Sequence, residues 1–246
     1  IVMALIKSIS GFRGTIGGKT NDGLTPIDTV KFVSAFAAFI KETYNKEKIT
    51  IVLGRDARVS GEMVSHLVVG TLMGMGVDVI DTGLSTTPTV EVAVTEKKAD
   101  AGIILTASHN PMQWNALKFL NAKGEFISAS EGKRVLELAA SEDFLFAEVD
   151  KLGHCISDTT TIDMHIEKVL ALDLVDVEAI KQANFKVAYD AVCSTGGLVL
   201  TKLLNALGVQ QVVALNPEPT GLFPHNPEPL PENITQICEA VVAEGC

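Results

Sequence analysis

The chain has 246 residues, of which 47% are hydrophobic and 20% charged, with 20 Lys and Arg against 30 Asp and Glu. A formal net charge of −10 argues against nucleic acid as the main partner, because binding a phosphate backbone needs a basic face. No apolar stretch approaches the roughly 18 residues of a membrane span, and no leader pattern precedes Met3, the expected start, so we expect a cytoplasmic protein. Cys155, Cys193, Cys238 and Cys246 form no close pair, which favours reduced thiols over a disulfide or a zinc site.

From residue 25 onward, two apolar periodicities alternate, and each predicts one kind of element. Thr25 and Pro26 predict a helix start, as N-cap and first-turn residue, with a buried stripe that runs from Val33 to Ile40. We then expect, in chain order, a strand at 49–53, a helix from Ser60, which caps it, to Met73, a strand at 77–80, a helix at 87–98, a strand at 101–105, a hairpin of 117–120 with 125–127, and a helix at 130–140.

This alternation predicts a layered α/β domain with a largely parallel sheet and one antiparallel edge. Weak periodicity at 141–160 suggests a boundary, so we expect a first domain at 1–150 and a second at 151–246. The second should contain strands at 186–192 and 212–215 and helices at 196–206 and 232–243, and it should be incomplete, because two strands cannot bury the last helix. Six of the nine prolines lie in the segment 216–231, which we expect to be an ordered, rigid loop rather than a flexible linker.

Two glycine-containing loops are candidates for anion binding at the carboxyl ends of strands. In the first, residues 11–18, the glycines allow close backbone approach and Arg13 offers a planar donor fork for phosphate, although such loops are often only turns. In the second, residues 54–61, Arg55, Asp56 and Arg58 could form an ion-paired turn, which more often braces a loop than performs chemistry.

The third loop carries a candidate nucleophile, Ser108, at the end of the strand expected at 101–105. Glycines do not flank this serine, so the loop is not the GxSxG elbow of a hydrolase. Sequence adjacency does not establish a pairing of Ser108 with His109, because neighbouring side chains of an extended backbone point apart. Lys118 is the stronger candidate for an acid/base or a phosphate clamp. An ordinary helix-capping serine remains an equal alternative from the residues alone.

Four motifs favour a functional serine at position 108 over a helix-capping one. The sequence TASHNP around Ser108, followed by Asn115, Lys118 and Phe119, resembles the active-site serine loop of the α-D-phosphohexomutases, the phosphoglucomutase/phosphomannomutase family. GFRGTIGG resembles the N-terminal loop of that family, GRDARVSG its second motif, and NPEPTGLFPHNPEP its proline-rich loop. These motifs occur in the family's order over essentially the whole chain.

The resemblance implies two phosphohexomutase-type α/β domains with mixed, mostly parallel sheets, and a serine that carries a phosphoryl group between the 1- and 6-positions of a hexose through a bisphosphate. Ser108, Lys118, Arg13 and His109 match catalytic positions. The positions expected to support the loops are Asn110, Asn115, Arg55 and Asp56. The expected partners are hexose phosphate and hexose bisphosphate, without nucleic acid or membrane, in a monomer or homodimer.

The expected cofactor is Mg²⁺, held by the phosphate on Ser108 and by three aspartates of a DxDxDR-type loop that this sequence lacks. A second departure from the family is Ala116, which stands where a glycine is expected. We therefore expect an N-terminal piece of a mutase that is inactive by itself. Glucose or mannose phosphate is favoured because the chain lacks an FGTDGIRG form of the N-terminal loop. The alternatives are a phosphoglucosamine mutase and a non-catalytic phosphosugar-binding or interaction module.

Overall fold

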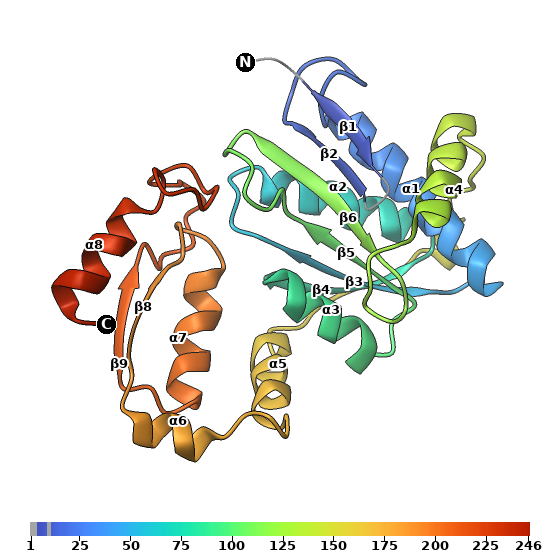
Figure 1. Cartoon of the computed structure of the whole chain (residues 1–246). Helices are drawn as coiled ribbons and strands as arrows, with labels where there is room; N and C mark the ends of the chain where they lie inside the picture. The colour runs from blue at the N-terminus through green and yellow to red at the C-terminus, as the bar shows by residue number, and fades with distance from the viewer. Residues whose placement is uncertain (1–3, 9–10) are drawn as a thin grey trace. The chain divides into compact units, whose positions relative to one another are not determined.

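The computed structural model describes residues 4–8 and 11–246, so the expected start at Met3 lies outside the described residues. The protein has a mixed α/β fold, as the sequence predicts, and it forms two compact units (Figure 1). The first unit comprises the chain up to Arg55, together with Ser60–Ala107 and Gln113–Thr159. The second unit comprises Asp56–Val59, Ser108–Met112 and Thr160–Cys246. The expected boundary at residue 150 stays a prediction.

The first unit is built on a seven-stranded sheet with the order β1-β2-β6-β5-β3-β4-β7. Its strands are β1 (Leu5–Ser8), β2 (Gly11–Thr15), β3 (Thr50–Arg55), β4 (Asp78–Leu84), β5 (Ala101–Leu105), β6 (Trp114–Leu120) and β7 (Cys155–Ser157). β5, β3, β4 and β7 run parallel, whereas β6, β2 and β1 form an antiparallel edge. The parallel part places the carboxyl ends of β3 and β5 at one edge of the sheet, directly before the two loops that follow them.

Helices cover both faces of this sheet (Figure 1). They are α1 (Pro26–Tyr44), α2 (Gly61–Gly74), α3 (Thr87–Glu96) and α4 (Ala129–Ser141). The predicted cap of α1 is confirmed, because the Thr25 side chain accepts a hydrogen bond from the backbone N–H of Asp28. α1, α2 and α4 bury a core that includes stacked Phe36 and Phe119 rings, with centroids 4.0 Å apart. α3 packs against β3 and β5 outside that core.

Three local predictions in the first unit are wrong. Residues 11–15 of the first glycine-rich segment form strand β2, which pairs with β6, rather than a loop. Glu125–Ile127 is not a strand; an isolated bridge joins Phe126 to Leu120, because β2 occupies that edge of β6 up to Lys118 and leaves only its last residues open. Ser60 stands at the N-cap of α2 but does not cap it, because its hydroxyl accepts a hydrogen bond from Asn115 instead.

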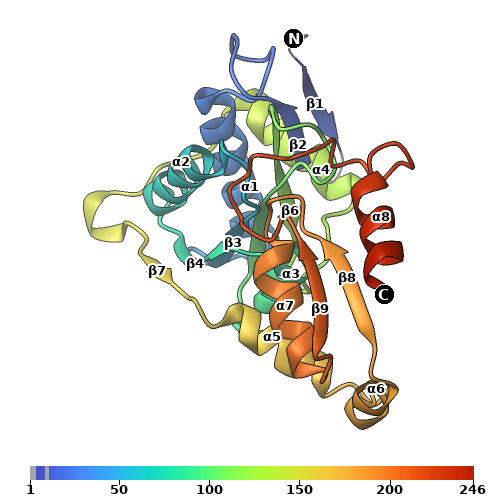
Figure 2. The same cartoon turned by 90° about the vertical axis from the view of Figure 1, so that its left-hand side faces the viewer.

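The second unit contains a two-stranded parallel sheet of β8 (Lys186–Asp190) and β9 (Gln211–Leu215). Its helices are α5 (Thr161–Leu170), α6 (Val177–Ala183), α7 (Gly196–Ala206) and α8 (Thr235–Glu244) (Figure 2). The sequence patterns predicted β8, α7, β9 and α8 but not α5 or α6. Within the described part of the chain, no helix combines the length and apolar character needed to cross a bilayer.

Candidate functional site

Ser108 lies in a turn three residues beyond the end of β5, and its side chain is exposed. The residue has a left-handed backbone conformation with φ of 55°, which costs a residue other than glycine roughly 1–2 kcal/mol. No helix begins at this turn, so the alternative of an ordinary helix-capping serine is excluded. Strained residues of this kind concentrate at functional sites, where the surrounding structure holds them in place.

A cavity of about 350 Å³ opens beside Ser108 within the second unit. This volume lies at the lower end of the range for small-molecule sites, roughly 300–1,000 Å³. The cavity wall is formed by four segments that are separate in sequence: Asp56, the loop of Ser108 and His109, residues directly after β8, and the proline-rich segment. The position is the one that open α/β sheets use for ligands, beyond the carboxyl ends of strands.

His109 contacts both Ser108 and the proline-rich segment. Its Nδ1 atom lies 3.5 Å from Ser108 Oγ, and its Nε2 atom lies 3.0 Å from Glu228 Oε2. A carboxylate only accepts hydrogen bonds, so Glu228 favours the tautomer that carries the hydrogen on Nε2 and leaves Nδ1 as an acceptor toward the serine hydroxyl. The left-handed turn at Ser108 explains this pairing, which an extended backbone would not allow.

The loop after β5 is held in place by Arg58, which is only 1% exposed. The guanidinium donates hydrogen bonds to the backbone oxygens of Ser108 (2.8 Å), Asn110 (2.7 Å) and Pro111 (2.8 Å). Asp56 accepts from Arg58 Nε at 3.1 Å, so the ion-paired turn that the sequence suggested is present. The second glycine-containing loop therefore supports the serine loop through Arg58 and Asp56.

The proline-rich segment is tied to the end of β8 by a partly buried contact between His225 and Asp190. His225 Nε2 lies 2.8 Å from Asp190 Oδ2, and His225 Nδ1 lies 2.9 Å from the Asn226 carbonyl oxygen. The Asn226 carbonyl and Asp190 both raise the pKa of His225, because both of its ring nitrogens face acceptors. Burial favours the neutral form of Asp190, but hydrogen bonds from Asn216, His225 and the Val192 backbone lower its pKa overall.

Arg13 and Lys118 belong to the first unit, on neighbouring strands of its antiparallel edge. Gly11 of β2 pairs with Lys118, and Arg13 pairs with Ala116, so the two basic side chains lie on one face of the sheet as diagonal neighbours. Lys118 acts on Glu91 of α3: burial raises the pKa of that carboxyl, and the lysine charge opposes the rise. This face thus carries two cations within one pair of strands.

The remaining predicted residues have structural surroundings in the first unit. Asn115 is fully buried; its side-chain amide donates to Ser60 Oγ at 2.9 Å, and so ties the start of β6 to the start of α2. Arg55 ends β3 and lines a separate cavity of about 400 Å³ with His66 and Asp81. Asn115 thus joins β6 to α2, and its expected support of the serine loop stays a prediction, as does that of Arg55, which is not among the residues that line the cavity beside Ser108.

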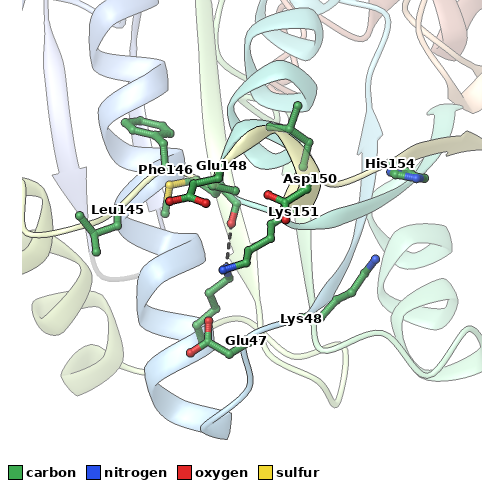
Figure 3. A pocket seen from close by; sticks show the side chains of 13 residues that line it. Glu47, Lys48, Leu145, Phe146, Glu148, Asp150, Lys151 and His154 are labelled. Carbon is green, nitrogen blue, oxygen red and sulfur yellow. Dashed lines mark hydrogen bonds between the residues drawn. The ribbon is translucent and has the colours of Figure 1, made fainter.

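A cavity of about 660 Å³ lies in the first unit (Figure 3). Lys48, Lys151 and His154 line it together with the acidic Glu47 and Glu148, and Lys41 Nζ donates to the Met75 carbonyl oxygen at 2.8 Å. These charges offset one another, and none of the predicted site residues contributes to the wall. We therefore place the candidate site at Ser108 and not here.

Sequence reasoning missed one residue of the site, Glu228, and it missed the contacts of Arg58 with the serine loop. The acidic residue within NPEP was visible, but nothing local showed that it faces His109, 119 positions earlier in the chain. The spacing of Asp56 and Arg58 suggested their ion pair, yet the three carbonyl partners of the arginine lie about 50 positions away. Both contacts come from tertiary structure and leave only a weak signal in sequence.

The fold and this site define an α/β protein that presents a serine beyond the carboxyl end of a strand. The chain belongs to the phosphoglucomutase/phosphomannomutase family of α-D-phosphohexomutases: the family's α/β/α domain I matches residues 5–146, and its α/β/α domain II matches residues 163–246.

Individual relatives agree with this assignment. A phosphoglucomutase/phosphomannomutase from Thermococcus kodakarensis is 38% identical over 235 residues, which cover 94% of this chain and 50% of the relative. A Methanococcoides burtonii protein named "probable phosphoglucosamine mutase" is 31% identical over 226 residues, covering 92% of this chain and 50% of that protein. A solved phosphoglucomutase/phosphomannomutase family protein from Burkholderia thailandensis has a TM-score of 0.79 at 25% identity, covering 97% of this chain and 51% of that structure. The chain thus spans about half the length of these relatives.

Proposed function

We propose that the intact protein interconverts hexose 1-phosphate and hexose 6-phosphate, with Ser108 as the carrier of the transferred phosphoryl group. The observation that carries the proposal is the geometry of Ser108, an exposed hydroxyl residue held in a left-handed turn at a cavity wall. Membership of the phosphohexomutase family supports the same reaction class. A helix cap or a core position would not account for this combination of strain, exposure and bracing.

The proposed reaction needs two transfers that balance each other. In the first, the bond from phosphorus to Ser108 Oγ breaks, a bond from phosphorus to a sugar oxygen forms, and the proton of that sugar hydroxyl passes to Oγ. The sugar is then a bisphosphate. In the second transfer its other phosphoryl group returns to Ser108 Oγ, and the serine proton passes to the released sugar oxygen. The protein contributes mainly by positioning and by neutralising charge.

Roles for the side chains follow from their chemistry. His109 is the residue that we assign to proton movement at Ser108, since its Nδ1 atom faces the serine hydroxyl and Glu228 fixes its tautomer. Lys118 and Arg13 are assigned to neutralising the phosphoryl oxygens, because they are two cations on one sheet face. Asn110 and Asp56 support the serine loop, the first through its carbonyl bond to Arg58 and the second through its ion pair.

Mg²⁺ is part of the proposal as a cofactor bound partly through the phosphoryl group on Ser108. Residues 4–8 and 11–246 contain no group of three or more His, Cys, Asp or Glu side chains that could hold an ion. The described residues therefore do not form a metal site by themselves, and we assign no step to the ion. When bound, such an ion neutralises phosphoryl charge.

Glucose or mannose phosphate is the substrate that we propose, with glucosamine phosphate as the second candidate. The relative from Thermococcus kodakarensis carries a phosphoglucomutase/phosphomannomutase name. The relative from Methanococcoides burtonii, in contrast, is named for phosphoglucosamine. Assays with the 1-phosphates of glucose, mannose and glucosamine in parallel distinguish these candidates by the ratio of their kcat/KM values.

The test compares the wild-type protein with Ser108→Ala in conversion of glucose 1-phosphate to glucose 6-phosphate, with Mg²⁺ and glucose 1,6-bisphosphate present. We expect Ser108→Ala to lower kcat by at least about 10⁴-fold, because it removes the acceptor of the phosphoryl group. Ser130→Ala, at an exposed serine of α4, is the matched control and should retain activity. The same assay on the 246-residue chain alone tests whether it lacks turnover by itself.

Peptide mapping of the phosphorylated protein supplies a second readout. A phosphate on Ser108 supports the assignment, and a phosphate on another residue contradicts it. Binding of sugar phosphates without turnover or phosphorylation would instead support the non-catalytic binding module.

A further inference from the structure

Arg58 is a buried cation that makes most of its hydrogen bonds to the backbone of one short loop. Its Nη1 and Nη2 atoms donate to the carbonyls of Pro111, Asn110 and Ser108 at distances of 2.7–2.8 Å. The Asp56 carboxylate accepts from Nε and also from the backbone N–H of Arg58. The Phe223 ring covers the guanidinium, with its centroid 5.2 Å from Cζ. Five groups, namely the three carbonyls, the Asp56 carboxylate and the Phe223 ring, thus surround a side chain that is 1% exposed.

A buried charge that is merely paired adds little to stability, because its desolvation offsets the attraction. The arrangement at Arg58 is better explained by geometry. A planar guanidinium directs several N–H groups in a fixed fork, and here the fork collects the carbonyls of three loop residues on one rigid plane. One of those residues is Ser108, whose left-handed conformation requires support from its surroundings.

We propose that Arg58 is the positioning residue of Ser108: by binding the carbonyls of Ser108, Asn110 and Pro111, it fixes the turn that presents the serine at the cavity. The inference rests on the proposed function, because positioning matters to the reaction only if Ser108 accepts the phosphoryl group. Arg58 itself has no role in contacting substrate here. It acts through the backbone carbonyls of the loop.

The consequence is a loss of rate rather than a loss of fold. A displacement of a reacting group by about 1 Å can lower a rate by about 100-fold. Arg58→Lys keeps the positive charge beside Asp56 but replaces the planar fork by a single ammonium group, which cannot meet three carbonyls in one plane. The serine would then remain present and chemically intact but would no longer be held in one conformation.

The experiment uses the intact protein in its dephosphorylated form, with glucose 1,6-bisphosphate as the phosphoryl donor. The initial rate of Ser108 phosphorylation, measured by peptide mass spectrometry, should fall by about 100-fold in Arg58→Lys. Hydrogen exchange at residues 108–112 should become faster, while exchange in β5 and α1 remains as in the wild type. Arg134→Lys, at an exposed arginine that pairs with Glu42, is the matched control and should change neither readout.

Arg58→Ala gives a second, independent variant. Guanidinium ion at a non-denaturing concentration should partly restore its phosphorylation rate, since the ion can occupy the vacated space between Asp56 and the three carbonyls; methylammonium should not. Rescue by guanidinium but not by methylammonium would show that the planar donor geometry, and not positive charge alone, supports Ser108.

The outcomes separate the two hypotheses. If Arg58→Lys is phosphorylated at the wild-type rate with unchanged exchange in the loop, the positioning role is overturned. If wild-type Ser108 accepts no phosphoryl group, the proposed function fails, and loop exchange still reports whether Arg58 holds the turn. If Arg58→Ala does not fold, Arg58→Lys decides the question by the two readouts above.

Discussion

Different kinds of interaction stabilise the interior of each of the two units. In the first, Phe12, Phe32, Phe36 and Phe119 are at most 2% exposed and form two stacked pairs, Phe12 on Phe32 with centroids 3.7 Å apart and Phe36 on Phe119. Between residues 160 and 246, the least exposed hydrophobic side chain is that of Val209, at 4%. In the second unit, polar interactions take the place of a large apolar core, among them the ion pair of Asp190 with His225.

The same kind of substitution should therefore act differently in each unit. Apolar burial stabilises the first unit in proportion to the area removed from water, and it is insensitive to pH. Hydrogen bonds and close backbone contacts stabilise the second unit, so its stability should depend on charge state and on local steric fit. The site loop of Ser108 belongs to the second kind, since its support comes from Arg58.

The largest expected effect is in the aromatic core. Phe119→Ala removes a fully buried ring that stacks on Phe36 and meets Phe12 edge-on, so we expect the free energy of unfolding of the first unit to fall by about 3–5 kcal/mol. Urea unfolding with hydrogen exchange resolved by segment measures it. Phe185→Ala, at a ring that is 53% exposed, is the control and should cost less than about 0.5 kcal/mol. Equal losses in the two variants would contradict the contrast between the units.

An intermediate effect is expected at the start of α7 in the second unit. A Cβ atom at Gly197 would lie 1.8 Å from the Pro217 carbonyl oxygen, whereas one at Gly196 would meet nothing closer than 3.6 Å. Gly197→Ala should therefore cost about 1–3 kcal/mol and increase hydrogen exchange in the proline-rich segment. Gly196→Ala, one position earlier, should leave both unchanged. A tolerated Gly197→Ala would mean that steric fit does not hold this loop.

The same contrast explains how much of the fold could be predicted from sequence. β5 at Ala101–Leu105 and α7 at Gly196–Ala206 match the predicted bounds, because their patterns are local: a buried apolar run and an apolar stripe of helical period. β2 and β7 were missed, because these short strands are defined by partners on β6 and β4 that lie far away in sequence. Local sequence pattern thus predicts elements that carry their own apolar run or stripe. It fails to predict short strands whose definition depends on a distant partner strand.

The candidate site divides in the same way. Ser108 could be found from its position after an apolar strand and from its motif, but its left-handed conformation could not, since the backbone is set by Arg58. The contact of Glu228 with His109 likewise depends on where the proline-rich segment returns. The assignment of Lys118 and Arg13 to catalysis stays a prediction. Sequence shows which groups are present, and tertiary contacts decide which conformation they adopt.

The smallest expected effect concerns pH and the second unit. The folded-state pKa of His225 is raised, so its contribution to stability is fully present below the ordinary histidine value of about 6.5 and is lost as pH rises through the folded value. The pKa of Asp190 is lowered, so its contribution is present above about 3.9 and is lost on strong acidification. The second unit should therefore become less stable from neutral pH upward, by about 1 kcal/mol or less.

Urea unfolding at each pH, followed by a short exchange pulse at one fixed pH, measures this slope separately for each unit. His225→Gln should abolish the decline above neutral pH. His165→Gln is the matched control: burial lowers the pKa of His165, so its contribution is lost as pH falls rather than as it rises, and the decline above neutral pH should persist. A first unit that shows the same pH slope would break the distinction between a core held by apolar burial and loops held by charge.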